Sequence, residues 1–121
     1  MVSSYQDLSV WQRAMELAEK VFALTADLPR EQMYGLSVQM QRAVVSVPSN
    51  IAEGHARDST KEYLRFVSIA LGSLAELETQ LMLCERLKLL TVQRVNDDCV
   101  LADEVGKMLR GVQRSLKEKL N

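Results

Sequence analysis

Residues that bend or cross-link a chain are scarce in this sequence of 121 residues, which has two prolines, five glycines, two cysteines and 5% aromatic residues. Such a composition argues against a turn-rich, aromatic-rich β-sandwich and predicts helices joined by few connections. Cys84 and Cys99 are too few for a disulfide framework, and neither belongs to a CxxC or Cys/His ligand pattern. Both are therefore predicted to be reduced thiols in the core.

Charge of one sign and long apolar runs are also missing. Fifteen basic residues against sixteen acidic ones leave a net charge of −1, so composition gives no electrostatic argument for nucleic acid or an anionic membrane. Any basic site must therefore be confined to a small part of the surface. No stretch approaches the roughly 18 consecutive apolar residues of a membrane span, and the first residues show no basic segment followed by an apolar run. We expect a cytoplasmic protein without a membrane segment or secretory signal.

Patterns that carry catalysis are absent as well. The single histidine, His55, cannot supply the two Glu-x-x-His motifs of a di-iron carboxylate bundle, and after Gly54 it is predicted to lie in a solvated connection. There is no GxSxG elbow, phosphate loop or dinucleotide fingerprint, because the glycines are scattered singly. Glu53, Glu76 and Glu78 are best explained as exposed helix residues. The sequence predicts no catalytic, cofactor-binding or metal-ligating set, so we expect neither an enzyme nor a cofactor.

Apolar residues recur at three- and four-residue steps in four segments, which predicts four amphipathic helices. Their predicted ranges are 9–28, 31–54, 60–89 and 92–120. Ser9 and Thr91 are predicted to cap the first and fourth helices, and Pro29 to end the first. With short connections and 47% apolar residues, the chain is expected to form one all-α domain, 1–121, an antiparallel up-and-down four-helix bundle.

Pro48 falls inside the second segment, where it would remove the hydrogen bond to the carbonyl of Val44. Two interpretations remain open: a kinked helix over 31–54, or two helices with Pro48 at the first position of the second. The apolar stripe keeps its phase across the proline, which favours the kinked helix. Gly54 is then expected to form a left-handed cap at the end of this helix.

The third segment carries the strongest signals. Ser59 and Glu62 form a capping box at its start. Two apolar stripes follow on different sides of the helix, so more than one neighbour must cover it. Gly72-Ser73 interrupts the segment, and such a pair allows close approach of another helix or relieves crowding at a subunit contact. Surplus apolar helix surface is what an oligomer buries, so self-association is expected.

One polar cluster surrounds the second helix and the turn into the third. The cluster consists of Gln39, Arg42, Asn50, Glu53, Arg57, Asp58, Lys61 and Arg65. Its basic members, Arg42, Arg57, Lys61 and Arg65, are candidate contacts for nucleic acid or a protein partner. The alternative is structural: these side chains surround the kink and the turn with ion pairs, Glu53 pairing with Arg57.

Several of these residues together resemble the four-helix bundle proteins encoded by intervening sequences within bacterial 23S ribosomal RNA genes. The resemblance includes Gln41-Arg42-Ala43, Ser46-Val47-Pro48-Ser49-Asn50-Ile51-Ala52-Glu53-Gly54, Arg57, Ser59, Glu62, Phe66, Ala70, Gly72-Ser73, Glu76-Leu77-Glu78, Asp7-Leu8, Val10-Trp11 and Met108-Leu109. It implies a cyclic homopentamer, a kinked second helix containing Pro48 and no established enzymatic activity. The link to ribosomal RNA is genomic.

The chain is also similar in architecture to the basic accessory bundle of diversity-generating retroelements, which binds its reverse transcriptase and nucleic acid; this near-neutral chain departs from that pattern. We therefore expect a non-enzymatic oligomeric interaction protein whose partners include RNA or DNA through Arg42, Arg57, Lys61 and Arg65. One alternative is an adaptor for a protein partner such as a reverse transcriptase-like enzyme. The other is an enzyme with an inter-subunit site using Glu53, Glu76 or His55.

Overall fold

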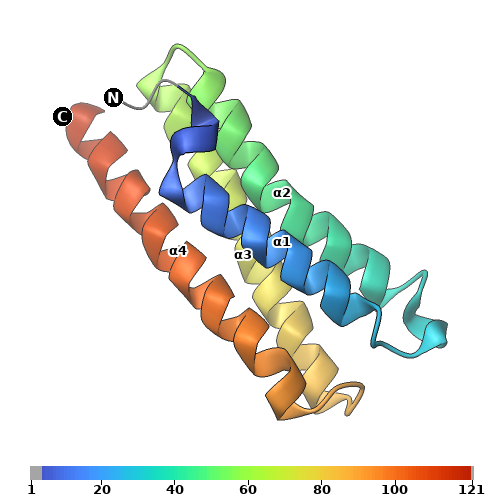
Figure 1. Cartoon of the computed structure of the whole chain (residues 1–121). Helices are drawn as coiled ribbons and strands as arrows, with labels where there is room; N and C mark the ends of the chain where they lie inside the picture. Colours follow the sequence, from blue (N-terminus) through green and yellow to red (C-terminus); the bar gives the residue numbers. More distant parts are fainter. Residues whose placement is uncertain (1–3, 121) are drawn as a thin grey trace.

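Four long helices, each antiparallel to the one before it, form the computed structural model, which describes residues 4–120 (Figure 1). Short 3-10 turns lie before the first helix, at Tyr5–Asp7, and after it, at Arg30–Gln32. The helices are α1 (Ser9–Thr25), α2 (Leu36–Ala56), α3 (Thr60–Arg86) and α4 (Val92–Leu120). This confirms the all-α four-helix bundle.

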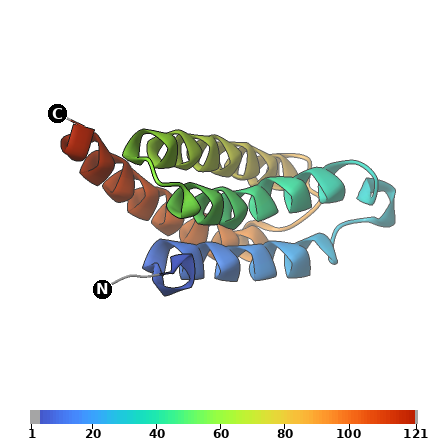
Figure 2. The same ribbon diagram turned by 90° about the horizontal axis from the view of Figure 1, so that it is seen from above.

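Each helix packs against two neighbours, in the order α1, α2, α3, α4 and back to α1. The helices α1 and α3 lie on opposite sides of the bundle (Figure 2). The core between them is aliphatic, and its largest fully buried side chains include Leu17, Leu24, Met40, Ile51, Leu74, Leu77, Leu81 and Leu109. Burial of these side chains at helical spacing is the main stabilising contribution to the fold.

The first helix is shorter than its sequence pattern predicted. It ends at Thr25 and not at residue 28, because the amides of Asp27 and Leu28 bond to carbonyls three residues back and tighten the chain before Pro29. Ser9 is the first helical residue and not the cap, which is Leu8 and makes no side-chain bond. The predicted first residue of this helix is therefore right, whereas the predicted cap at Ser9 and the predicted end at residue 28 are wrong.

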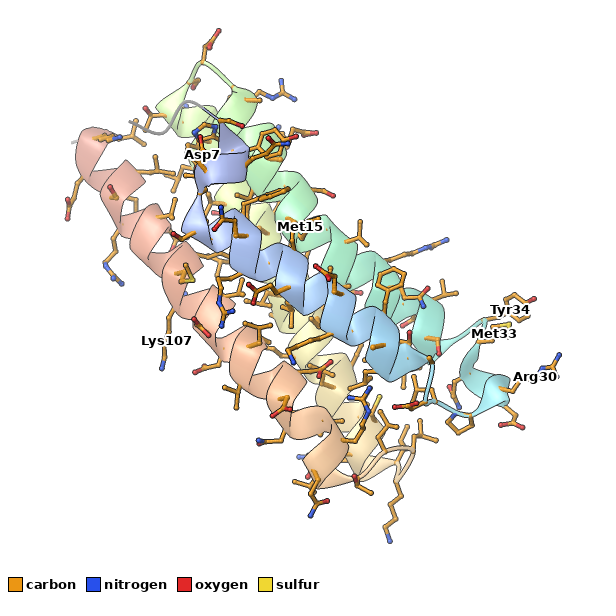
Figure 3. All side chains as sticks on the ribbon, in the orientation of Figure 1. Asp7, Met15, Arg30, Met33, Tyr34 and Lys107 are labelled. Carbon is orange, nitrogen blue, oxygen red and sulfur yellow. The ribbon has the colours of Figure 1, made fainter. Side chains whose placement is uncertain are left out.

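The second helix begins at Leu36 and not at residue 31, because the chain from Arg30 to Gln32 forms a separate 3-10 turn. In this connection Tyr34 is 90% exposed, and it points away from the bundle (Figure 3). From Leu36 the helix continues through Pro48 without interruption, so the two-helix interpretation is wrong. The kink itself stays a prediction.

Gly54 lies inside α2, which continues to Ala56, and has no positive φ. The predicted left-handed cap is therefore wrong. A Cβ at Gly54 would lie 2.7 Å from Cβ of Phe66 and 3.0 Å from Cδ1 of Tyr63. The glycine is needed because α3 approaches the backbone of α2 too closely for any side chain.

The third helix has the predicted start, since the Ser59 hydroxyl accepts a hydrogen bond from the Glu62 amide at 3.1 Å. It ends at Arg86 and not at residue 89. Lys88 has a φ of 59°, in the left-handed region, and this reversal lets the amide of Leu89 bond back to Cys84. The predicted cap of α4 is confirmed, because the amide of Arg94 donates to the Thr91 hydroxyl at 3.1 Å.

Among the described helices, α3 is long and apolar enough to cross a membrane, by length and composition alone. Core helices of water-exposed bundles share these properties, and α3 packs against both α2 and α4. Only 39% of its most apolar 18-residue window is buried within the chain. Because Ile69, Met82 and Leu83 of this helix stay exposed, its two neighbours do not cover all of its apolar surface.

Candidate functional site

The corner where α2 turns into α3 brings three of the four candidate basic residues together. Arg57 follows the end of α2, while Lys61 and Arg65 lie on the first turns of α3. The guanidinium carbons of Arg57 and Arg65 lie 5.1 and 4.6 Å from the centre of the buried Phe66 ring. Both distances fit cation–π contacts, so Phe66 holds the two arginines in place.

Carboxylates neutralise much of this corner. Arg57 lies 3.7 Å from Glu53, and Arg65 lies 3.3 Å from Glu62, both within one helical turn. These side chains are about half exposed, so each pair contributes little to stability. Lys61 is exposed and has no ion pair within residues 4–120. The structural alternative, including the pairing of Glu53 with Arg57, accounts for the arginines at this corner.

Arg42 does not belong to the corner. It lies fifteen residues before Arg57, which places it about 22 Å away along α2 at 1.5 Å per residue. There it lines an open hollow of ≈ 440 Å³ with Phe22, Val38 and Val45. The four candidate contacts therefore do not form one site.

Ser46, Ser73 and Asn50 form a polar contact between α2 and α3. The two serine hydroxyls are 2.8 Å apart, and the amide of Asn50 donates to the carbonyl oxygen of Ser46 at 2.7 Å. Ser73 therefore serves the packing of α3 on α2, and Asn50 is part of the same contact. Gly72 has a different position, since a Cβ there would meet nothing within 4 Å.

The residues of the enzyme alternative are not brought together within one chain. His55 lies in the last turn of α2, and not in a connection as predicted, with its ring edge-on to Tyr63 at 5.7 Å. Glu53 pairs with Arg57, and Glu76 is exposed on the middle of α3. Cys84 is buried with its sulfur 3.7 Å from that of Met40, and burial raises the pKa of its thiol. Within the described part of the chain, no three His, Cys, Asp or Glu side chains are placed to hold a metal ion.

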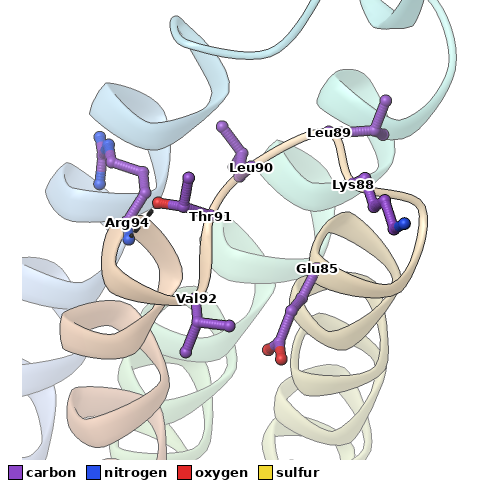
Figure 4. A pocket seen from close by; sticks show the side chains of 7 residues that line it. All are labelled: Glu85, Lys88, Leu89, Leu90, Thr91, Val92 and Arg94. Atoms are coloured by element: carbon purple, nitrogen blue, oxygen red, sulfur yellow. Dashed lines mark hydrogen bonds between the residues drawn. The ribbon is translucent and has the colours of Figure 1, made fainter.

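A hollow of ≈ 530 Å³ lies at the turn from α3 to α4 (Figure 4). Its charged lining residues are Glu85, Lys88 and Arg94, and Arg94 is already bound at 2.6 Å to Asp27, which lies in the connection just after α1. The remaining lining is mostly aliphatic. This arrangement ties the start of α4 to the connection that follows α1 and offers no group placed for acid–base chemistry.

Asp98 is a buried carboxylate that sequence patterns did not single out, although it lies three residues after Val95 and four before Ala102 on the apolar face of α4. It is 1% exposed, and its Oδ2 has no hydrogen-bond partner in the described structure. Arg94 approaches its Oδ1 only to 3.9 Å. Burial raises the pKa of Asp98, and the positive charges of Arg94 and Lys20 oppose this rise.

Asp98→Asn is expected to raise the free energy of unfolding at neutral pH by about 1 kcal/mol, since a buried, poorly paired charge is removed. A raised native pKa means that the folded chain binds the proton more tightly than the unfolded one, whose pKa is about 3.9. Stability from Asp98 is therefore full below about pH 4 and is lost as pH rises through the native pKa. Urea unfolding from acidic to neutral pH measures this loss, which the variant should lack.

The exposed Asp97→Asn is the control for that measurement and should leave most of the stability and of its pH dependence in place, since the charge of Asp97 is a lesser cause of the raised pKa of Asp98 than burial is. A loss of stability in Asp98→Asn at neutral pH would contradict the account, because it would mean that Arg94 over-compensates the burial of the carboxylate.

The side of α3 turned away from α2 and α4 is apolar or small over about 22 Å of helix. We call this surface the outer face of α3. It consists of Ser68, Ile69, Gly72, Ala75, Glu76, Thr79, Met82 and Leu83, all exposed. Glu76 is its one charged residue, and the Thr79 hydroxyl is bonded back to the Ala75 carbonyl at 2.9 Å. Ile69, Met82 and Leu83 are 40%, 53% and 40% exposed.

The family model of the 23S rRNA-intervening sequence protein matches residues 6–111, which include α1 to α3 and most of α4. The chain belongs to this family. Among solved structures, a protein of unknown function from the S23 ribosomal protein family of Bacteroides thetaiotaomicron is similar, with a TM-score of 0.81 and 24% sequence identity. The match covers 86% of this chain and 97% of that one, and it supports the fold. No curated protein matches the chain.

Proposed function

We propose that this member of the 23S rRNA-intervening sequence protein family is a non-enzymatic interaction protein whose copies assemble through the outer face of α3. The observation that carries the proposal is this long, nearly uncharged and exposed helix face. Monomeric proteins rarely expose large contiguous apolar patches, and such surfaces mark interfaces. A second copy is the partner that this surface best fits, since the same apolar face is available on every chain.

Gly72 supports the same partner. A glycine inside a helix costs about 1 kcal/mol relative to alanine, and nothing within this chain occupies the space beside it. Together with Ser68 and Ala75 it gives the outer face of α3 a shallow surface, on which a helix from another copy can lie closely. Such small residues let packed helices approach near the lower end of the usual 8–10 Å interaxial distance.

Light scattering of the native chain at micromolar concentration tests this proposal. Assembly predicts a stable mass that is a multiple of the 13.7 kDa chain. A mass near five chains would also match the pentamer that the family resemblance implies. A single-chain mass throughout the micromolar range would overturn the proposal.

Nucleic-acid contact at the α2–α3 corner is a second candidate function. Phe66 holds the guanidinium groups of Arg57 and Arg65 beside the start of α3, where the helix dipole is positive and Lys61 is unpaired within the described residues. Phosphate groups fit such a surface. Arg42 would contribute only to a partner long enough to reach it along α2.

The adaptor role and the inter-subunit active site rank below these two. Nothing at the corner favours a reverse transcriptase-like protein over any other protein partner. Of the enzyme alternative, Glu76 lies on the proposed interface, whereas Glu53 and His55 lie near the far end of the bundle. A catalytic pair would thus require Glu76 of one copy to meet Glu53 or His55 of another, although these residues lie at different heights along the bundle.

A further inference from the structure

The positive charge of this chain is concentrated at its C-terminal end, which overall composition conceals. Residues 106–121 contain five of the fifteen basic residues and only one of the sixteen acidic ones, a net charge of +4. The remaining 105 residues hold ten basic and fifteen acidic side chains, a net charge of −5. A local basic surface therefore exists outside the α2–α3 corner.

Four of these basic residues lie on one face of α4. Lys107, Arg110, Arg114 and Lys117 follow one another at steps of three, four and three residues, and all are exposed. We call them the α4 basic strip. Lys107 points away from the bundle (Figure 3). The opposite face of the helix contains Val105, Leu109 and Leu116, which are buried in the core.

Few acidic side chains of the chain pair with these basic residues. Lys107 pairs with Asp103 at 3.3 Å in an exposed contact, and Arg110 acts on Glu78 of α3 only at longer range. Arg110, Arg114 and Lys117 form no ion pair with residues 4–120. The helix dipole favours basic residues in the last turn, which accounts for Lys117 but not for the three residues before it.

We propose that the α4 basic strip binds the phosphate backbone of a nucleic acid duplex, without sequence preference. At 1.5 Å per residue the strip is about 15 Å long, which spans roughly four phosphates of one strand at 3.4 Å each. Arginine matches phosphate oxygens with paired N–H donors. This inference rests on the proposal that the chain binds nucleic acid, but it places the main contact on α4 and not at the α2–α3 corner. It does not depend on self-association through α3.

Other polyanions fit the strip less well. A basic amphipathic helix binds a membrane by inserting its apolar face, but the apolar face of α4 is buried in the bundle. Single-stranded nucleic acid is bound with aromatic stacking, and the strip contains no aromatic residue. A duplex presents regularly spaced phosphates, which a straight row of charges on a helix can follow.

Fluorescence anisotropy with labelled duplex DNA and duplex RNA of random sequence tests the proposal on the native chain. Four phosphate contacts predict binding that weakens about a hundredfold between roughly 50 and 200 mM salt. In the variant Arg110→Gln, Arg114→Gln, Lys117→Gln, the weakening over that range should fall to about threefold, with much lower affinity at low salt. The matched control is Arg57→Gln, Lys61→Gln, Arg65→Gln, which removes the same charge from the corner and should bind nearly as the native chain does.

Each outcome decides the proposal. Loss of binding in the strip variant alone supports it, and a preference for DNA or for RNA identifies which duplex is the partner. Loss in the corner variant alone overturns the strip and leaves the corner as the nucleic-acid site. No binding of either duplex at low salt overturns the nucleic-acid candidate itself. Equal binding to phosphatidylserine vesicles or polyglutamate overturns duplex recognition, and circular dichroism verifies that both variants are folded.

Discussion

Gly54→Ala is expected to lower the free energy of unfolding by about 2–3 kcal/mol, after the roughly 1 kcal/mol that alanine gains in helix propensity. The added Cβ would lie 2.7 Å from Cβ of Phe66, 3.0 Å from Cδ1 of Tyr63 and 3.3 Å from the Tyr63 carbonyl oxygen. Two of these atoms belong to backbone or to the first side-chain carbon, which cannot rotate away. The start of α3 must therefore move off α2, and urea unfolding measures the loss.

Gly111→Ala is the matched control, because Gly111 is also inside a helix but has open space around it. The nearest atom to its added Cβ is a terminal nitrogen of Arg114 at 3.9 Å. This variant should gain up to about 1 kcal/mol from helix propensity alone. If Gly54→Ala were as stable as Gly111→Ala, the close packing of α2 on α3 at Gly54 would be wrong.

The double variant Ile69→Lys, Met82→Lys is expected to abolish self-association while leaving each chain folded. Both side chains lie on the outer face of α3 and are 40% and 53% exposed within the chain, so lysine can extend into water there. In an assembly that buries this face, both lysines of every copy would be buried in an apolar contact. Burying unpaired charges costs more than an interface of one helix face contributes.

Phe22→Lys, Val45→Lys is the control for this double variant. These residues are equally large and apolar, each is 44% exposed, and they lie on α1 and α2. The charge change is identical, so general repulsion between chains is matched. Retained assembly in this control, with loss in the α3 variant, assigns the contact to α3; the reverse result would assign it to α1 and α2.

Much of the fold follows from the sequence, because buried helix faces repeat with a fixed period. The four helices, the Ser59 cap and the continuity of α2 through Pro48 were all predictable in this way. The role of Gly54 was not predictable, since a glycine near a helix end is compatible both with a left-handed cap and with close packing of another helix. Only the position of Phe66 and Tyr63 distinguishes the two, and that depends on how α3 lies on α2.

The candidate site was predictable to the extent that its residues are neighbours along the chain. Arg57, Lys61 and Arg65 share a corner because they flank one short turn. Arg42 was grouped with them although it lies about 22 Å away along α2. The α4 basic strip was readable from spacing alone, but the near-zero net charge of the whole chain masked it.

Sedimentation velocity of the native chain beside the two lysine variants tests assembly through the outer face of α3. We expect the native chain and Phe22→Lys, Val45→Lys to sediment as the same oligomer at micromolar concentration, and Ile69→Lys, Met82→Lys to sediment as a folded single chain. An oligomer of unchanged size in the α3 variant would contradict assembly through this face.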